Sequence, residues 1–230
     1  FLDVDGTLVD FKNNPSDIHL SGEIEKTIRE MMKKDNINVN IVSGRSIESL
    51  EMIFNNIDDI NLFGEHGIFY KIGNTKILSP KLKDNKSWQD AVVNRFNDFM
   101  DILPGSWIEK KKHAIAFHYR GVPEEYLKNR IKNIRNSLNY LLYKHNLQVI
   151  NGNKVIEILE RENNKSLAIR EISRMNNISR DDLLIAIGDD TTDESMFEYL
   201  KNKNSLTFKV GKNKSTAAKY YVENTTEVSK

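Results

Sequence analysis

The sequence predicts an α/β fold in which a mainly parallel sheet forms a core and a smaller α/β unit is inserted into it. Two observations support this prediction. Short apolar runs alternate with helical patterns near both ends of the chain, as in consecutive β-α units. The middle of the chain differs, because two strand-like runs, a helix and two further strand-like runs follow one another there. We therefore expect core segments at residues 1–82 and 161–230 and an α/β cap at residues 83–160.

The first core segment predicts three strands and two helices. Strands are expected at residues 1–4, 37–42 and 60–63, where the apolar runs lie. Ser21 is a suitable N-cap for a helix that continues to Met32, and Glu23 places an acid in its first turn. A second helix is expected over residues 46–55.

The inserted unit predicts two helices and four strands. A helix is expected over residues 88–102, and apolar residues at helical spacing indicate a long helix over 124–145. Strand-like runs occupy residues 107–109, 114–119, 147–150 and 155–159. Their order along the chain predicts a small α/β layer.

The second core segment opens on a helix that starts near Lys165 and runs to Met175. The continuous apolar run at residues 183–187 is typical of a strand that is covered on both faces. Shorter strands are expected at 206–210 and 220–222. Only two residues precede Asp3, whereas a strand usually has about 5 residues, and the last residues resemble the start of a helix. We therefore expect flanking residues at both ends.

The composition restricts the classes of partner. Lys and Arg number 34 against 33 Asp and Glu, so the net charge of +1 predicts neither nucleic acid nor a membrane surface as a partner. The chain has no cysteine, which excludes disulfides and thiolate metal sites. No apolar run approaches the length that spans a membrane, and no signal peptide precedes the first strand. A cytoplasmic monomer is the expectation.

The first strand runs into two aspartates and a glycine turn. Asp3 and Asp5 are spaced i and i+2 on extended chain, so their side chains point to the same side. One can then act as a nucleophile or metal ligand while the other handles protons, and Gly6 allows a sharp turn. Taken alone, the pair is equally compatible with a solvated acidic turn.

Two further segments contain groups that suit an anion. Ser43 and Gly44 offer a hydroxyl and backbone N–H groups at a turn before a helix, although a plain serine N-cap explains them as well. Lys165 stands at a helix start and opposes the helix dipole, which calls for an anion nearby. The alternative for Lys165 is a solvated surface lysine.

The chain places an acidic run directly after the apolar strand at residues 183–187. Asp189, Asp190, Asp193 and Glu194 are four acids within six residues, which are costly together unless a cation neutralises them. Carboxylate oxygens without Cys or His suit Mg²⁺. An acidic helix N-terminus explains Asp193 and Glu194 but not the two aspartates that follow the strand.

These segments are expected to meet in one crevice. Asp3, Ser43, Gly64 and Asp189 lie at or just past the carboxyl ends of predicted strands, and ligands of open α/β sheets bind at that edge. The combination is far more specific than any one segment.

At this point the chain resembles the haloacid dehalogenase-like phosphatases, and more narrowly the family of trehalose-6-phosphate phosphatases. The matching motifs follow one another along the whole chain. They are Leu2-Asp3-Val4-Asp5-Gly6-Thr7-Leu8, Ile41-Val42-Ser43-Gly44-Arg45, Gly64-Glu65-His66-Gly67, Glu109-Lys110-Lys111, His118-Tyr119-Arg120, Val155-Ile156-Glu157, Asn164-Lys165 and Gly188-Asp189-Asp190-Thr191-Thr192-Asp193-Glu194.

The resemblance implies a Rossmann-like core and a set of catalytic roles. Asp3 would attack phosphorus to form an aspartyl-phosphate, and Asp5 would protonate the leaving sugar and then activate water. Mg²⁺ would be held by Asp3, the backbone carbonyl of Asp5 and Asp189, with Asp193 in support. Ser43, Gly44 and Lys165 would bind the phosphate. The substrate would be a small sugar phosphate, trehalose 6-phosphate, which the enzyme would hydrolyse to trehalose and phosphate.

The resemblance also implies that the cap binds the sugar. Substrate-binding residues would be Arg45, Glu65, His66, Gly67, Glu109, Lys111, His118, Arg120 and Glu157. His66 is as easily a structural residue, and packing is the expectation for Trp88 and Trp107. A phosphatase of another sugar or glycosyl phosphate, and a silent sugar-phosphate sensor, are the alternatives.

Overall fold

The chain forms two compact units, which are described separately. The computed structural model describes residues 1–12, 17–73, 75–78, 87–152, 154–212 and 215–229. One unit comprises Phe1–Leu82 and Asn164–Lys230, and the other comprises Lys83–Asn163. The expected boundary between residues 82 and 83 lies outside the described residues, and the second boundary lies three residues beyond the expected position at 160.

The first unit contains a mainly parallel sheet. One part pairs β9 (Leu184–Gly188), β10 (Ser205–Val210) and β11 (Tyr220–Val222), and another pairs β1 (Asn40–Val42) with β2 (Asn61–Gly64), all in parallel. Leu2 joins the two parts through parallel bridges to Ile41 and Ile187. The expected strand at residues 1–4 is thus reduced to this bridge, because the chain then leaves the sheet toward the turn at Gly6.

A hairpin that the sequence prediction missed extends this sheet. β3 (Phe69–Ile72) pairs antiparallel with β2, and β4 (Thr75–Leu78) pairs antiparallel with β3. Both strands are four residues long, which is too short for a clear alternating pattern. The core sheet is therefore mixed at this edge.

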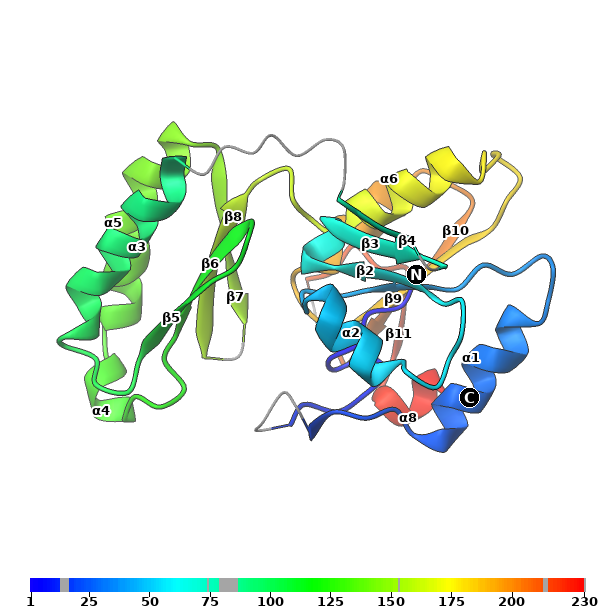
Figure 1. Cartoon of the computed structure of the whole chain (residues 1–230), viewed down its shortest axis with the longest axis horizontal. Helices are drawn as coiled ribbons and strands as arrows, with labels where there is room; N and C mark the ends of the chain where they lie inside the picture. The colour runs from blue at the N-terminus through cyan, green and yellow to red at the C-terminus, as the bar shows by residue number, and fades with distance from the viewer. Residues whose placement is uncertain (13–16, 74, 79–86, 153, 213–214, 230) are drawn as a thin grey trace. The chain divides into compact units, whose positions relative to one another are not determined.

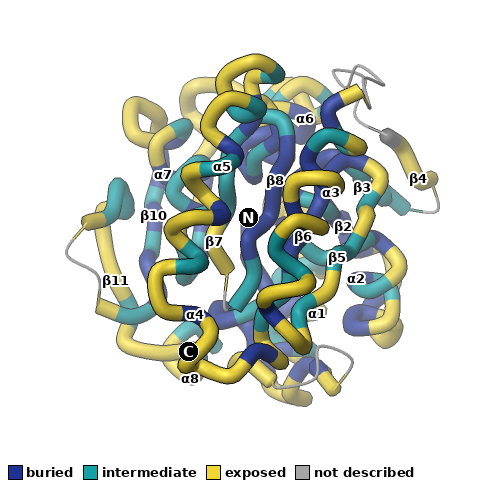
Figure 2. The backbone as a smooth tube through the Cα atoms, turned by 90° about the vertical axis from the view of Figure 1, so that its left-hand side faces the viewer, coloured by how far each residue is buried: buried dark blue, intermediate teal, exposed yellow. Residues whose placement is uncertain are grey.

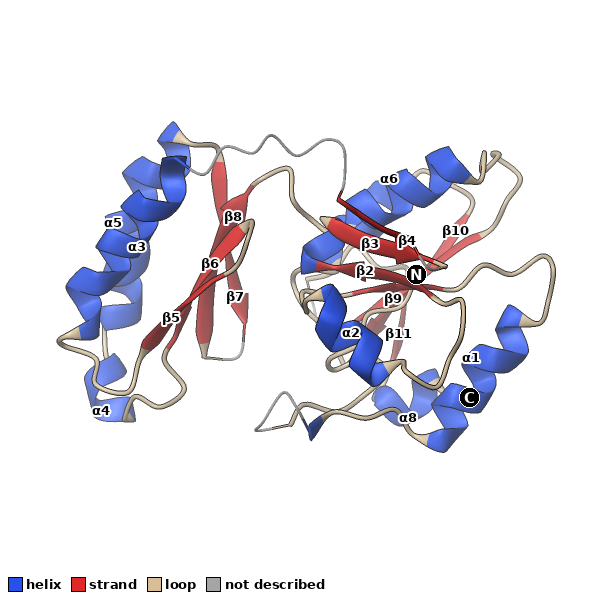
Figure 3. Ribbon diagram, in the orientation of Figure 1, coloured by secondary structure: helices blue, strands red, loops and turns tan. Residues whose placement is uncertain are grey.

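Helices cover both faces of the core sheet (Figure 3). Successive strand residues point to opposite faces, so Ile41 joins the apolar cluster of α1 (Gly22–Met32) and α2 (Ile47–Ile53), while Val42 joins that of α6 (Ser166–Met175) and α7 (Glu194–Leu200). Ser21 and Ser46 cap α1 and α2 by accepting hydrogen bonds from backbone N–H groups. A short helix, α8 (Thr225–Val228), follows β11.

The second unit is a four-stranded antiparallel sheet with helices on one face (Figure 1). The strand order is β5 (Trp107–Lys110), β6 (Ala114–His118), β8 (Val155–Glu160) and β7 (Leu147–Gly152). Ile115, Phe117, Ile156 and Ile158 form an apolar cluster with α3 (Ser87–Met100) and α5 (Arg130–Lys144). Most of β8 is buried, as Figure 2 shows.

The prediction of one long helix over residues 124–145 is wrong in one respect. The helix is divided into α4 (Glu124–Leu127) and α5, because Asn129 adopts a left-handed conformation with φ of 62°. Asparagine tolerates this conformation better than most residues. Leu127 and Ile134 are both buried across the break, so the apolar spacing gave no sign of it.

The predicted α/β fold with a mainly parallel core and an inserted α/β unit is confirmed. Among the described residues, every helix is too short or too polar to cross a membrane.

Candidate active site

Asp3 lies buried where the first segment of chain leaves the sheet. Its backbone N–H donates to the carbonyl of Ile187 in β9, and its Oδ2 accepts a hydrogen bond of 3.0 Å from the Thr7 hydroxyl. The turn at Gly6 brings Thr7 back over Asp3, since the Gly6 N–H donates to the carbonyl of Val9. The local fold thus fixes the Asp3 carboxylate in one orientation.

Lys165 is buried against this carboxylate. Its side chain is 3% exposed, and its Nζ lies 2.6 Å from Asp3 Oδ1 and 2.7 Å from Asp193 Oδ1. Lys165 is the N-cap residue of α6 and lies 162 positions after Asp3 in the sequence. The alternative of a solvated surface lysine is therefore wrong.

Asp193 organises the loop that follows β9. Its Oδ2 accepts hydrogen bonds from the backbone N–H groups of Asp189 and Asp190, at 2.9 and 3.0 Å. The loop is packed so closely that a Cβ on Gly188 would stand 2.1 Å from Asp193 Cγ. A side chain at position 188 would therefore displace the acid that holds Lys165.

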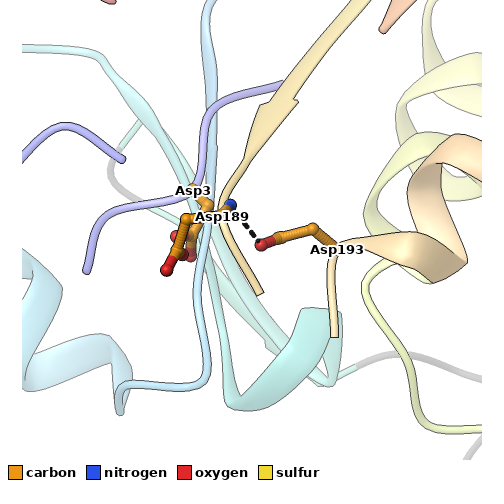
Figure 4. A group of neighbouring side chains, drawn as sticks. All are labelled: Asp3, Asp189 and Asp193. Atoms are coloured by element: carbon orange, nitrogen blue, oxygen red, sulfur yellow. Dashed lines mark hydrogen bonds between the residues drawn. The ribbon is translucent and has the colours of Figure 1, made fainter. Parts of the chain in front are cut away.

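Three carboxylates share this site. Oxygens of Asp3, Asp189 and Asp193 lie within 4.8 Å of one another, and Figure 4 shows the three side chains together. Burial raises the pKa of each of them to about 7, against the opposing attraction of Lys165. Burial alone would lower the pKa of Lys165, but the charges of Asp193, Asp3 and Asp190 together raise it. The cluster thus carries more negative charge than one lysine neutralises.

This donor set fits a hard divalent cation. Asp189 Oδ1 is buried and accepts no hydrogen bond within the part of the chain that the structure describes. All the available donor atoms are oxygens, as Mg²⁺ prefers. Asp193 already accepts three hydrogen bonds, so its contribution to a metal site is to support the loop and the lysine.

Asp5 is paired with Arg45 rather than gathered with the three clustered acids. Arg45 Nε and Nη2 each lie 2.7 Å from one oxygen of the Asp5 carboxylate, which is a bidentate pair. The Arg45 backbone N–H donates to Ser43 Oγ at 3.2 Å. Ser43 is buried directly after β1, so Asp5, Ser43 and Arg45 form one connected group.

The turn at residues 65–67, labelled η2 (Glu65–Gly67), packs against this group. The His66 N–H donates to the carbonyl of Ser43, and the Glu65 N–H donates to the carbonyl of Arg45. Gly44 packs closely against the His66 ring, and a Cβ at position 44 would lie 2.9 Å from a ring carbon. Gly67 allows α6 to approach closely, since a Cβ added at position 67 would lie 3.1 Å from the Ala168 nitrogen. These contacts give His66 and Gly67 a structural role in the first unit.

In the second unit, the polar residues predicted to bind sugar gather on the sheet face opposite α3 and α5. His118 Nε2 lies 2.9 Å from Glu109 Oε2, and Lys111 Nζ lies 2.7 Å from Glu157 Oε1. The hydrogen bond from His118 is the main cause that lowers the pKa of Glu109. Arg120 follows β6 and is exposed. We call Glu109, Lys111, His118 and Glu157 the cap polar cluster.

Comparison with known proteins identifies the family. A family model described as trehalose-phosphatase matches residues 1–226. The chain belongs to the trehalose-phosphatase family. It is 31% identical to alpha,alpha-trehalose-phosphate synthase B of Dictyostelium discoideum over 99% of this chain and 29% of that protein. It is 28% identical to a trehalose-phosphatase of Schizosaccharomyces pombe over 86% of this chain and 23% of that protein. The chain thus spans less than a third of these relatives.

Solved structures share the fold of this trehalose-phosphatase family member. The trehalose-6-phosphate phosphatase C-terminal domain of C. albicans is 23% identical, with a TM-score of 0.86 over 99% of this chain and 87% of that one. A trehalose-6-phosphate phosphatase related protein is 26% identical, with a TM-score of 0.72 over 99% of this chain and 92% of that one. The predicted family resemblance and the Rossmann-like core are confirmed.

Thr7 and Lys209 position the site but had no predicted role. The Thr7 hydroxyl donates to Asp3 Oδ2 and so holds that carboxylate. Lys209 is 2% exposed in β10, and its Nζ donates to the Asp190 carbonyl at 2.8 Å and to Glu194 at 3.3 Å. A single lysine within the otherwise apolar strand at 206–210 was the available signal.

Proposed function

We propose that this trehalose-phosphatase family chain hydrolyses trehalose 6-phosphate to trehalose and phosphate, with Mg²⁺ and an aspartyl-phosphate intermediate. The observation that carries the proposal is the buried contact of Lys165 with Asp3 and Asp193, beside the unsatisfied oxygen of Asp189. A buried carboxylate, an adjacent cation and a set of oxygen donors together suit phosphoryl transfer onto an aspartate.

The proposed reaction has two displacements at phosphorus. A carboxylate oxygen of Asp3 attacks phosphorus while the bond from phosphorus to the sugar oxygen breaks, and Asp5 gives a proton to that oxygen. Asp5 then takes a proton from water, the water oxygen attacks phosphorus, and phosphate leaves as the Asp3 carboxylate is restored. Asp5 acts as both acid and base, so no proton is lost over the cycle.

Other residues of the chain hold the reacting groups. Asp3 and Asp189 would bind Mg²⁺ together with the backbone carbonyl of Asp5, and the ion would supply positive charge against the phosphate and the nucleophile. Lys165 and Ser43, with the N–H groups that follow Ser43, would bind phosphate oxygens. Because Arg45 occupies both oxygens of Asp5, the pair has to open before Asp5 can handle protons.

The sugar specificity is assigned to the second unit. The cap polar cluster combines two carboxylates with an ammonium and an imidazole on one sheet face. Such groups bind sugar hydroxyls well where water is excluded. Arg120 and Glu65 are further candidates for sugar contacts.

Phosphate release from a panel of sugar phosphates tests the proposal. We expect trehalose 6-phosphate to be the preferred substrate, EDTA to abolish turnover, and added Mg²⁺ to restore it. The Asp3→Asn variant should be inactive, since it lacks the nucleophile. If another sugar phosphate is preferred by orders of magnitude, that compound replaces trehalose 6-phosphate as the assigned substrate. Turnover that survives Asp3→Asn would exclude the aspartyl-phosphate intermediate. A folded wild-type protein that binds sugar phosphate without hydrolysing it would be a sensor instead.

A further inference from the structure

Trp107 is the large aromatic residue on the open face of the second unit. Its sequence context predicted packing, but its side chain is 51% exposed, whereas Trp88 in the same unit is 2% exposed. The Trp107 ring stacks on the His118 ring with centroids 3.9 Å apart and planes inclined by 7°. One face of the indole is therefore covered by His118 while the residue as a whole remains half exposed.

The indole is held in place by the strand pairing. Trp107 is the direct cross-strand partner of His118 between β5 and β6, and His118 is fixed in turn by its contact of 2.9 Å with Glu109. A side chain with few free torsions that is stacked on a fixed ring loses little entropy when a ligand covers it. The arrangement is therefore preorganised for binding at its open face.

Trp107 shares this face with the cap polar cluster. Glu109 lies two residues after Trp107 on β5, and Ala116 pairs with both Glu109 and Glu157 across the sheet. Side chains two residues apart on a strand point to the same side and stand about 7 Å apart. Along β5, Trp107 and Glu109 are thus separated by about the width of one hexose ring.

We propose that the exposed face of Trp107 is a platform for a pyranose ring of the substrate. A pyranose has C–H bonds on its faces and hydroxyls on its rim, so a flat aromatic ring suits the faces while carboxylates and an ammonium suit the rim. The platform makes a disaccharide phosphate a better ligand than a phosphate without the second ring. This inference rests on the proposed function and extends it to a residue that determines specificity.

Steady-state phosphate release separates the platform from a structural role. Trp107→Ala should raise KM for trehalose 6-phosphate by about 10-fold with kcat changed by less than about 2-fold, because it removes binding that is equal in ground and transition states. Trp107→Phe should keep most of the affinity. Tyr143→Ala is the matched control, because Tyr143 is an aromatic residue of the same unit that is 90% exposed on α5. A KM for Trp107→Ala equal to that of the control would overturn the inference.

A binding measurement makes the result independent of turnover. The chain has 2 tryptophans, and Trp88 is buried, so a change in tryptophan emission on adding trehalose reports mainly on Trp107. The Asp3→Asn variant should show a saturable change, and the Asp3→Asn, Trp107→Phe double variant should not. A saturable trehalose response together with a wild-type protein that has no phosphatase activity would support the platform and reject the proposed reaction. An active wild-type enzyme with the same trehalose response in both variants would reject the platform alone.

Discussion

Replacing Gly6 with alanine should damage the site more than the fold. Gly6 has φ of +85°, and an added Cβ would stand 2.3 Å from Asp189 Oδ2 and 2.8 Å from Phe11 Cε2. Favourable contacts to carbon lie near 3.5 Å or beyond, so the Asp189 carboxylate has to move by about 1 Å. Such a shift exceeds the tolerance of about 0.2 Å on metal-ligand distances.

Gly211→Ala provides the matched control. Gly211 has φ of +79°, and within 4 Å of its added Cβ there is no atom of the residues that the structure describes. Both variants incur the left-handed backbone cost of about 1–2 kcal/mol, but only Gly6→Ala adds about 1–3 kcal/mol for overpacking. We expect a further loss of about 10²-fold in kcat/KM for Gly6→Ala alone, from a misplacement of this size.

Urea denaturation measures the stability of both variants, Mg²⁺ titration measures their metal affinity, and phosphate release measures their turnover. The expected result is that Gly6→Ala unfolds at lower urea, binds Mg²⁺ more weakly and turns over more slowly than Gly211→Ala. Equal free energies of unfolding for the two variants, together with wild-type Mg²⁺ affinity in Gly6→Ala, would refute the predicted clash with Asp189.

Three further predictions concern charges. Because burial raises the pKa of Asp3, Asp189 and Asp193 to about 7, the folded protein holds more protons than the unfolded chain between pH 4 and 7. The free energy of unfolding, measured in EDTA, should therefore fall as pH rises through that interval. Each of these groups contributes up to about 1.4 kcal/mol per pH unit to this fall. Denaturation from pH 5 to 7.5 tests the sign, and a difference between wild type and Asp189→Asn that does not change with pH would contradict it. Lys165→Met should lower kcat/KM by about 10²-fold or more, because it removes the cation that contacts Asp3; near-normal turnover of this variant would show that the lysine is dispensable. Lys111→Met should destabilise the protein by about 1–3 kcal/mol, since it takes a partner from Glu157, which is 8% exposed. The exposed Lys110, changed to Met, is its control and should change stability by less than about 0.5 kcal/mol, so equal effects of the two would argue against the pair.

Much of the core could be predicted because each signal was local. The strand at residues 184–188 and the acids that follow it are adjacent in sequence, and Ser21 marks the start of α1 directly. Strand ends of a parallel sheet meet at one edge, so the positions of Asp3 and Asp189 could be inferred without knowing any contact.

What the sequence did not reveal depends on contacts between distant residues, on strand register and on the backbone conformation of single residues. The pairing of Asp5 with Arg45 joins residues 40 positions apart, and no periodicity encodes it. The break at Asn129 depends on a backbone conformation, which the apolar spacing of the helix does not encode. Trp107 was expected to pack because tryptophan usually does, whereas its strand register leaves it on the open face.

The buried ion contact between Lys165 and Asp3 spans 162 positions of the chain. Asp193, the other partner of the lysine, comes later still, and Lys209 ties the loop around it from β10. During synthesis Asp3 therefore leaves the ribosome well before Lys165, and Asp193 and Lys209 follow later still. A ribosome that stopped between residues 165 and 189 would release a chain with every residue of the second unit, but without the acids that surround Lys165 and Asp3 in the folded first unit.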